Sequence, residues 1–488
     1  MPIQIIHSAQ TLKLGRIDLS ELQPAVQQAE LERIARTEVM VSFDLARDPL
    51  WRAVLLRLSP HQHVLVLLIH HILSDAWSRA VIHQELSALY NAHVGGRLPS
   101  LAELPLQYAD YAAWQRQIME GEEGKQLQSY WLQQMRDEHL TLGFPTDRPR
   151  PPVQTHVGAS KTLLLRNELL QKLKVLSHRE HATLFMTLLC AFNVLLNRYS
   201  GQPDIVVGIP VSGRNRAEFE HMVGQFINIL PIRTRLSADC SLRGLLSQVR
   251  DTCLAAFSHQ DCPFDMIVSG LKLDRGLDHH PLFQVMFALE QSLLHDLELS
   301  GLRCKALNIG PRPMPYDLIM IATEEPEGIN IVIDYNVDLF DAVTIERLAV
   351  HYLNLLEGMA ATLDVVVSEL PLLAESERRQ LLFDWNRTER AYPRVAGVHE
   401  LFECQAGATP DAVAAASEAG QPGYGQLNER ANRLAHHLRG LGLERGTGRA
   451  LRRAQSGHAG RNPGDRRARR SLCTAGPGLP RRTAIVHA

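Results

Sequence analysis

The stretch His-His-Ile-Leu-Ser-Asp-Ala-Trp-Ser, residues 70–78, decides how the chain is interpreted, because groups capable of proton chemistry crowd onto a junction between two predicted elements. The apolar run before it, 63–69, has the length and composition of a strand covered on both faces. After it, apolar residues recur at helical spacing from Val81 to Leu89, until the Gly-Gly pair at 95–96. The histidines are therefore predicted to lie where a buried strand ends, as in an active-site loop.

Three side chains of this stretch could carry chemistry. The neutral imidazole of His70 or His71 can accept a proton from an amine or a hydroxyl. Asp75 can cap the helix or pair with an arginine. These residues alone also allow a purely structural interpretation, in which both histidines are polar residues at a strand end and Asp75 only caps the helix. A metal site is disfavoured, since adjacent histidines on a strand point to opposite faces and no His/Cys/Asp cluster follows at ligand spacing.

Composition excludes several classes of protein. The 488 residues include 51 Lys and Arg against 53 Asp and Glu, and this near-neutral balance argues against a nucleic-acid partner. The longest apolar candidate helix, 184–196, is interrupted by Thr187 and Asn193, and the N-terminus lacks the features of a signal peptide. Seven scattered cysteines without a C-x-x-C pair fit a reducing compartment. We expect a cytoplasmic protein with no membrane partner.

Strands and helices are predicted to interleave along most of the chain. The predicted strands on either side of a turn at Pro60 should form an antiparallel pair. Further strands are expected over 3–14, 160–165, 204–210, 282–289 and 329–336. Helices are expected over 19–36, 106–135, 167–180, 184–201, 242–257 and 343–363.

The opening stretch resembles the His-His-x-x-x-Asp-Gly motif of chloramphenicol-acetyltransferase-like acyltransferases, above all of the condensation domains of nonribosomal peptide synthetases. Five further blocks match that family's motifs in order: YADYAAWQ (108–115), GIPVSGR (208–214), GQFIN (224–228), HQDCPFD (259–265) and PLFQVMF (281–287). The resemblance covers about residues 3–370. It implies an α/β (α+β) fold of two lobes, a chloramphenicol-acetyltransferase-like pseudo-dimer, with the active site in a tunnel between the lobes.

The resemblance also implies a domain organisation. The N-terminal lobe would span 1–141 and the C-terminal lobe 142–370, followed by a linker over 371–397. Residues 398–446 resemble the beginning of an adenylation domain. The arginine-rich tail, 447–488, is predicted to be disordered or out of frame, and RNA binding by it is disfavoured because no aromatic residues are interleaved.

The family's first motif has no counterpart in this sequence. The N-terminal lobe is therefore expected to be incomplete at its start and to expose a sheet edge and part of an apolar face. We expect a chain of this kind, made alone, to be poorly soluble and to lack activity.

By resemblance, the reaction is peptide (amide) bond formation between aminoacyl or peptidyl thioesters in the synthesis of an antibiotic or other secondary metabolite. The substrates would be carried on 4'-phosphopantetheine of upstream and downstream peptidyl carrier domains. These carriers and the adenylation domain are the implied partners. The condensation domain would bind no cofactor of its own, and ATP and Mg would serve only a complete adenylation domain. The alternatives are a non-catalytic module that docks carrier proteins, or another acyltransferase of the superfamily.

The resemblance assigns roles to individual residues. His71 would lie beside the attacking amine, as a general base or as a positioning group. His70 and Asp75 complete the motif, and Asp75 would pair with Arg214 to hold the loop in shape. Ala76 stands where the family has glycine, so it is expected to affect the orientation of the loop. Three more residues are expected near the tunnel: Trp114, Asn228 and Gln260.

Overall fold

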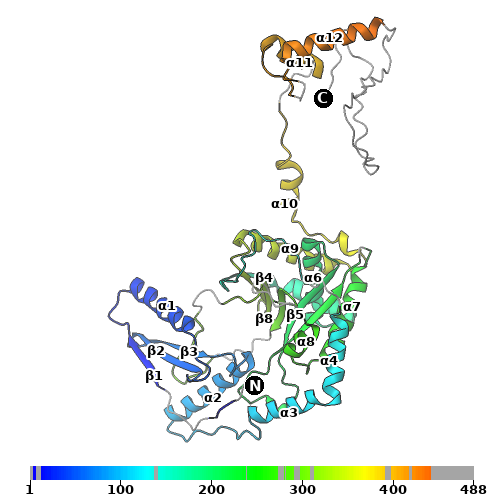
Figure 1. Cartoon of the computed structure of the whole chain (residues 1–488). Helices are drawn as coiled ribbons and strands as arrows, with labels where there is room; N and C mark the ends of the chain where they lie inside the picture. The colour runs from blue at the N-terminus through cyan, green and yellow to red at the C-terminus, as the bar shows by residue number, and fades with distance from the viewer. Residues whose placement is uncertain are drawn as a thin grey trace. The chain divides into compact units, whose positions relative to one another are not determined.

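The chain contains two compact units, Met1–Leu382 and Phe383–Ala488. The computed structural model describes residues 4–6, 13–136, 141–237, 239–272, 280, 282–290, 297–307, 313–390, 397–416 and 420–440. In the first unit, a three-stranded sheet and a six-stranded sheet each carry their own helices (Figure 1). This mixed α/β arrangement has the two sheets expected of a two-lobed fold.

The smaller sheet forms the lobe that carries the histidines. Its order is β1-β2-β3, in which β1 (Leu14–Asp18) runs parallel to β2 (Trp51–Ser59) and β2 antiparallel to β3 (Gln62–Ile69). Helix α1 (Pro24–Met40) covers one face of the sheet, where Leu31 and Ile34 pack with Val54 and Leu56. The antiparallel pair predicted on either side of Pro60 is therefore confirmed.

Two predictions concern the start of the chain. Residues 3 and 7–12 of the strand expected over 3–14 lie outside the described residues, and the described strand β1 pairs with β2 from Leu14 to Asp18. The helix expected over 19–36 begins at Pro24. The fixed φ of proline suits the first helical turn, where its missing N–H would have no partner in any case.

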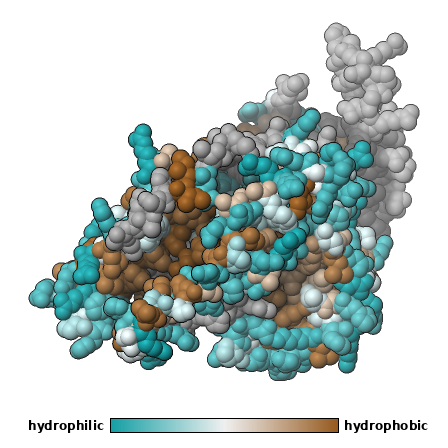
Figure 2. Space-filling model, turned by 90° about the horizontal axis from the view of Figure 1, so that it is seen from below, coloured by the Kyte–Doolittle hydropathy of each residue, from teal (hydrophilic) through white to brown (hydrophobic). Residues whose placement is uncertain are grey.

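The strand β3 is not covered on both faces, as its apolar run had indicated. It is an edge among the described strands, and its side chains alternate between the two faces. Val64 and Val66 pack toward the core under α1, whereas Leu65 and Leu67 are 44% and 37% exposed. Figure 2 shows apolar surface on the side of the first unit that carries this small sheet. Among the described residues, one face of β3 is therefore partly open to solvent.

The two faces of β3 predict different effects of a charge. Leu65→Lys should lower self-association and change the free energy of unfolding by no more than about 0.5 kcal/mol, because the side chain already contacts water. Val66→Lys, on the neighbouring residue, should destabilise the lobe because it places a charge in the core under α1. Light scattering measures the self-association of the two variants, and thermal melting measures their stability. Equal melting temperatures for the two variants would contradict the assignment of faces.

Three helices lead from the small sheet to the larger lobe. Helix α2 (Ala76–Val94) follows the histidine loop, and α3 (Tyr108–Glu120) and α4 (Glu122–Gln134) come next. The sequence predicted a single helix over 106–135, but Gly121 adopts an extended conformation and divides it. Glycine suits such a break because it is a poor helix former. Trp131 of α4 is buried and donates its indole N–H to the carbonyl of His259 at 2.9 Å.

The larger sheet has the order β4-β9-β8-β7-β5-β6. Its strands β7, β8 and β5 include parallel neighbours, while β4 with β9, β8 with β9 and β5 with β6 are antiparallel. The bounds are β4 (Gly158–Arg166), β5 (Asp204–Val211), β6 (Asn228–Arg235), β7 (Val285–Glu290), β8 (Leu318–Glu325) and β9 (Gly328–Asn336). The predicted strands near β4, β5, β7 and β9 are confirmed, whereas β6 and β8 were not predicted from the sequence.

Five helices pack with this sheet, and the positions of four of them agree closely with the predicted ranges. They are α5 (Asn167–Arg179), α6 (Leu184–Ser200), α7 (Leu242–Phe257), α8 (Phe264–Leu271), which was not predicted, and α9 (Ala342–Ala361). Helix α6 begins at Thr183, whose hydroxyl caps the N–H of Met186, and ends at Gly201 in the left-handed conformation. Residues 186–196 of α6 are all buried, so this helix forms the centre of the core.

The second unit contains two described helices, α11 (Val398–Ala408) and α12 (Tyr424–Gly440), which contact each other through Phe402 and Tyr424. The tail predicted over 447–488 lies outside the described residues. Within the described residues no single helix could cross a membrane; α5 and α6 together pass that test by length and composition, with a bend of 103° between them.

Candidate active site

The histidine stretch forms a short turn between β3 and α2. The N–H of His70 donates to the carbonyl of Leu50 at 2.9 Å, and the N–H of Leu73 returns to the carbonyl of His70 at the same distance. Asp75 is the N-cap of α2, where its Oδ1 accepts the N–H of Ser78 at 2.7 Å. Hydrogen bonds at both ends therefore hold the turn where the sequence indicated it.

Asp75 and Arg214 form a buried ion pair between the two lobes. Nη2 of Arg214 lies 3.2 Å from Oδ1 and 3.5 Å from Oδ2 of Asp75, and the two side chains are only 1% and 3% exposed. The N–H of Phe226 donates to Oδ2 at 3.0 Å. Nη1 of Arg214 donates to the carbonyls of Phe219 and Met222, the latter at 2.8 Å. Both oxygens of Asp75 and both Nη atoms of Arg214 thus have polar partners, whereas the buried Nε of Arg214 has none among the described residues.

The environment of Asp75 favours its charged form. Burial by itself raises the pKa of this carboxyl group, but the hydrogen bonds from Ser78, the charge of Arg214 and the N–H of Phe226 together bring the pKa below its usual value. Burial lowers the pKa of Arg214, although Asp75 opposes this effect. Because an arginine remains protonated in proteins, the pair is ionic at neutral pH. Asp75 therefore has no proton to give to a substrate.

A loop of the larger lobe, residues 219–226 between β5 and β6, is held by side chains of α2 and α3. Trp77 donates its indole N–H to the carbonyl of Glu220 at 2.8 Å, and the hydroxyl of Tyr108 donates to the carbonyl of Gln225 at 2.8 Å. Aromatic rings fill the space beneath, in a cluster of Tyr108, Tyr111, Trp114, Phe219 and Phe226. Burial in this cluster raises the pKa of Tyr111 to about 12, so its hydroxyl stays protonated.

The two histidines have different surroundings. His70 is partly buried; its Nδ1 accepts the N–H of Ile72 at 3.1 Å, and its ring meets Phe43 edge-on. The imidazole of His71 is exposed, and it has no hydrogen bond or ion pair to any part of the chain that the structure describes. His70 therefore stabilises the turn, whereas His71 is available to a ligand.

Ala76, Trp114, Asn228 and Gln260 lie in other surroundings. Ala76 is the first residue of α2 and needs no positive φ, so alanine fits where the family has glycine. Trp114 packs on Tyr111 and Phe219. Asn228 donates to the carbonyls of Gln260 and Cys262 at 2.8 and 2.7 Å. In the described chain, no hydrogen bond or ion pair joins these four side chains to His71.

Sequence reasoning did not assign a role to three residues that hold the lobes together: Trp77, Ser78 and Tyr108. A signal for Ser78 was present, because it follows Asp75 by three residues and must therefore share its face of the helix. Their partners on the loop 219–226 are main-chain N–H and C=O groups, which occur in nearly every residue. A sequence pattern therefore could not reveal these contacts.

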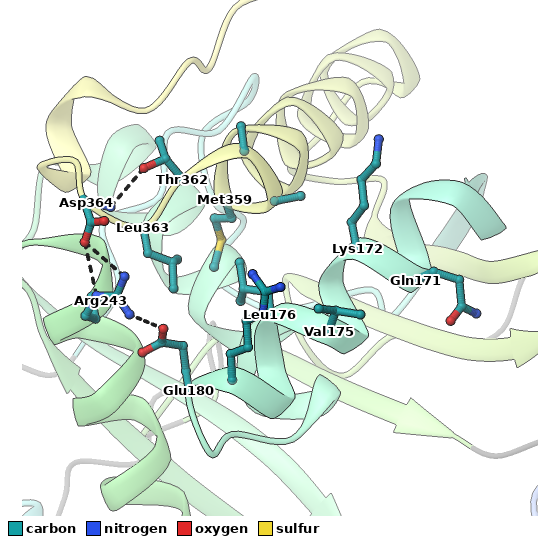
Figure 3. A pocket seen from close by; sticks show the side chains of 13 residues that line it. Gln171, Lys172, Val175, Leu176, Glu180, Arg243, Met359, Thr362, Leu363 and Asp364 are labelled. Carbon is teal, nitrogen blue, oxygen red and sulfur yellow. Dashed lines mark hydrogen bonds and ion pairs between the residues drawn. The ribbon is translucent and has the colours of Figure 1, made fainter.

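Two adjoining cavities lie in the larger lobe, away from the motif residues. Their volumes are about 550 and 650 Å³, and both are lined by parts of α5 and α9, including Lys172 and Ala360. Figure 3 shows Arg243 at one end of the first cavity, where it bridges Glu180 and Asp364. None of the motif residues lines these cavities. The described residues contain no group of three or more His, Cys, Asp and Glu placed to hold a metal ion.

Comparison with known proteins identifies the class. The model of the condensation domain family matches residues 1–382. A linear gramicidin synthase of Brevibacillus parabrevis is 44% identical over 443 residues, which is 90% of this chain and 6% of that protein. Chondramide synthase of Chondromyces crocatus is 40% identical over 441 residues, or 90% of this chain and 11% of that protein. The chain thus spans only a small part of these relatives.

Solved structures agree with this assignment. The X-domain from teicoplanin biosynthesis is 29% identical, with a TM-score of 0.69 over 76% of this chain and 83% of that one. The first condensation domain of the CDA synthetase, at 22% identity, shares the fold with a TM-score of 0.59 over 75% and 79% of the two chains. The chain belongs to the condensation domain family.

The buried ion pair predicts a strong coupling between its two residues. Asp75→Asn should destabilise the first unit by about 3–5 kcal/mol, because it leaves the charge of Arg214 buried without a counter-ion. Arg214→Gln should cost a similar amount, whereas the double variant should be less damaging than the sum of the two. Urea unfolding of the four proteins measures this coupling. Strictly additive losses would mean that the two side chains do not interact.

The lowered pKa of Asp75 predicts a specific dependence of stability on pH. The stabilisation by its charged form is complete above the unfolded-state pKa, about 3.9, and is lost as the pH falls through the lower folded-state pKa. The unfolding free energy of the unchanged chain should therefore fall more steeply below about pH 4 than that of Asp75→Asn. Urea melts between pH 3 and 6 check this difference. Parallel curves would contradict it.

Proposed function

We propose that this chain catalyses amide-bond formation between two thioesters carried on the phosphopantetheine arms of peptidyl carrier domains. The amine of the downstream aminoacyl thioester attacks the carbonyl carbon of the upstream thioester. The new C–N bond forms, the C–S bond breaks, and the upstream arm leaves as a thiol. The observation that carries this proposal is the exposed imidazole of His71 on a loop held by the Asp75–Arg214 pair.

The chemistry demands little beyond positioning and the management of one proton. A thioester is already activated, so the chain mainly has to hold two arms end to end. The attacking nitrogen must lose a proton as the bond forms, and the free imidazole of His71 can accept it or orient the amine. Asp75 is ionised and fully engaged, so its role is to fix the shape of the loop. No cofactor of the chain's own is needed for this step.

The other motif residues receive supporting roles. Asn228 holds the segment that enters α8, because its side chain also accepts the N–H of Phe264 at 3.0 Å. Gln260 supplies a main-chain carbonyl to Asn228, which fixes this segment beside the start of β6. Trp114 supports the aromatic cluster beneath the loop 219–226. Together these contacts shape the larger lobe on its side of the proposed tunnel.

The second unit is proposed to be the beginning of an adenylation domain over 398–446, after a linker over 371–397. The alignments with the synthetases cover 90% of the chain, more than the 382 residues matched by the condensation family. A four-domain nonribosomal peptide synthetase bound to AMP and glycine shares the fold over 90% of this chain at 22% identity, with a TM-score of 0.72 over 34% of that protein. The adenylation and carrier domains are the proposed partners.

A docking module without catalysis is the second candidate. It is favoured by the resemblance to the X-domain from teicoplanin biosynthesis, which has been solved in a complex with OxyB. Such a module needs a surface for a partner but no transfer between loaded carriers. The presence of His71 and of the complete Asp75–Arg214 pair favours catalysis instead.

The catalytic role of His71 predicts a large loss of transfer in His71→Ala. In a complete condensation domain that contains this sequence, and with two loaded carriers, the rate of amide formation in a single turnover should fall at least about a hundredfold, because general-base assistance is removed. Mass spectrometry of the quenched carriers measures the product. His61→Ala, on an exposed histidine of the β2–β3 turn, is the matched control and should keep the full rate.

His70→Ala should lower the melting temperature of the first unit, because it removes the acceptor of the N–H of Ile72. Full transfer by His71→Ala would contradict the proposed role of that histidine. Binding of carriers by the complete condensation domain without any amide product would select the docking module.

A further inference from the structure

Ser78 lies in the contact between the two lobes. It is fully buried in the first turn of α2, on the same face as Asp75. Its hydroxyl donates to the carbonyl of Gly224 at 2.7 Å, and it accepts the N–H of Gly224 at 3.1 Å and Nη2 of Arg214 at 2.9 Å. A hydroxyl group has one donor and two acceptor sites. All three are used here.

The main chain at Gly224 lies so close to the ring of Tyr108 that a side chain would not fit between them. A Cβ atom at this position would lie 2.1 Å from Cδ2 of Tyr108. The absence of a side chain is therefore what allows Ser78 to reach both polar groups of this residue. The neighbouring N–H of Phe226 is held by Asp75 in turn. With the bond from Trp77 to the carbonyl of Glu220, the loop 219–226 is thus fixed to α2 and its N-cap at four main-chain groups.

We propose that Ser78 is a positioning residue, whose hydroxyl fixes the main chain at Gly224 and the guanidinium of Arg214 against the helix that begins at the His71 loop. The inference rests on the proposed transfer function and adds a residue that sets the geometry between the lobes. Without the hydroxyl, the buried N–H and C=O of Gly224 and one hydrogen of Arg214 lose their partners. The loop 219–226 is then free to shift relative to His71.

Amide hydrogen exchange tests the anchoring directly on the full 488-residue chain. In Ser78→Ala, the peptide that contains Gly224 and Phe226 should exchange at least about tenfold faster than in the unchanged chain, because the amide of Gly224 loses its acceptor and the loop that carries both residues is loosened. Ser78→Cys keeps the volume but offers only a weak sulfur donor and acceptor, so it should show the same increase. Unchanged exchange of this peptide in both variants would overturn the proposal.

The matched control is Ser177→Ala. Ser177 is also buried, and its hydroxyl donates to the carbonyl of Leu173 and contacts Thr187, inside the larger lobe. Its loss should cost comparable stability, with no effect on the exchange at Gly224. An equal acceleration at Gly224 in Ser177→Ala would show general loosening and overturn the specific role of Ser78.

Transfer between loaded carriers supplies the second readout. Ser78→Ala and Ser78→Cys should lower the single-turnover rate at saturating carriers by about tenfold to a hundredfold, as expected for a small misplacement of reacting groups, with unchanged affinity for the carriers. Ser177→Ala should keep the rate. A normal rate in both Ser78 variants would overturn the proposal. An unchanged chain that forms no amide would count against the proposed function alone, since the exchange measurement decides the anchoring separately.

Discussion

The buried contact between Asp75 and Arg214 is the constraint on which the geometry of this protein depends. Two charges removed from water give little net stability, because desolvation cancels much of their attraction. Their value here is in the arrangement of the lobes: each charge is surrounded by hydrogen bonds that only one relative position of α2 and the loop 219–226 allows. A displaced lobe would leave buried charges and main-chain groups without partners. The contact therefore selects a single arrangement.

This arrangement explains why the two adjacent histidines differ. His70 is occupied by the N–H of Ile72, whereas His71 is exposed at the start of the turn whose other end is fixed by Asp75. The larger lobe contributes to the site by holding that turn. Transfer would consequently be sensitive to residues far from the reacting atoms, provided that they belong to the contact between the lobes.

Much of this could be predicted from the sequence. The helices α6 and α7 are long and periodic, and their predicted bounds agree closely with the structure. The contact of Asp75 with Arg214 was expected from two motifs that lie far apart in the chain. The exposure of Leu65 could not be predicted, because an apolar run shows that a strand can be buried but does not show what covers it. The strand β6 was overlooked because Pro231 and its arginines are unusual in a strand, although the sheet accommodates them. The partners of Ser78 are main-chain groups, which no sequence pattern distinguishes.

The central claim is that the loop held by Asp75 presents His71 to an attacking amine. A crystal structure of the chain with an aminoacyl-pantetheine analogue, whose thioester is replaced by a stable thioether, tests it most directly. We expect the amine nitrogen to lie within hydrogen-bond distance of a ring nitrogen of His71, about 2.6–3.2 Å, with the Asp75–Arg214 pair intact. An amine bound beyond the reach of His71, or directed to another side chain, would contradict it.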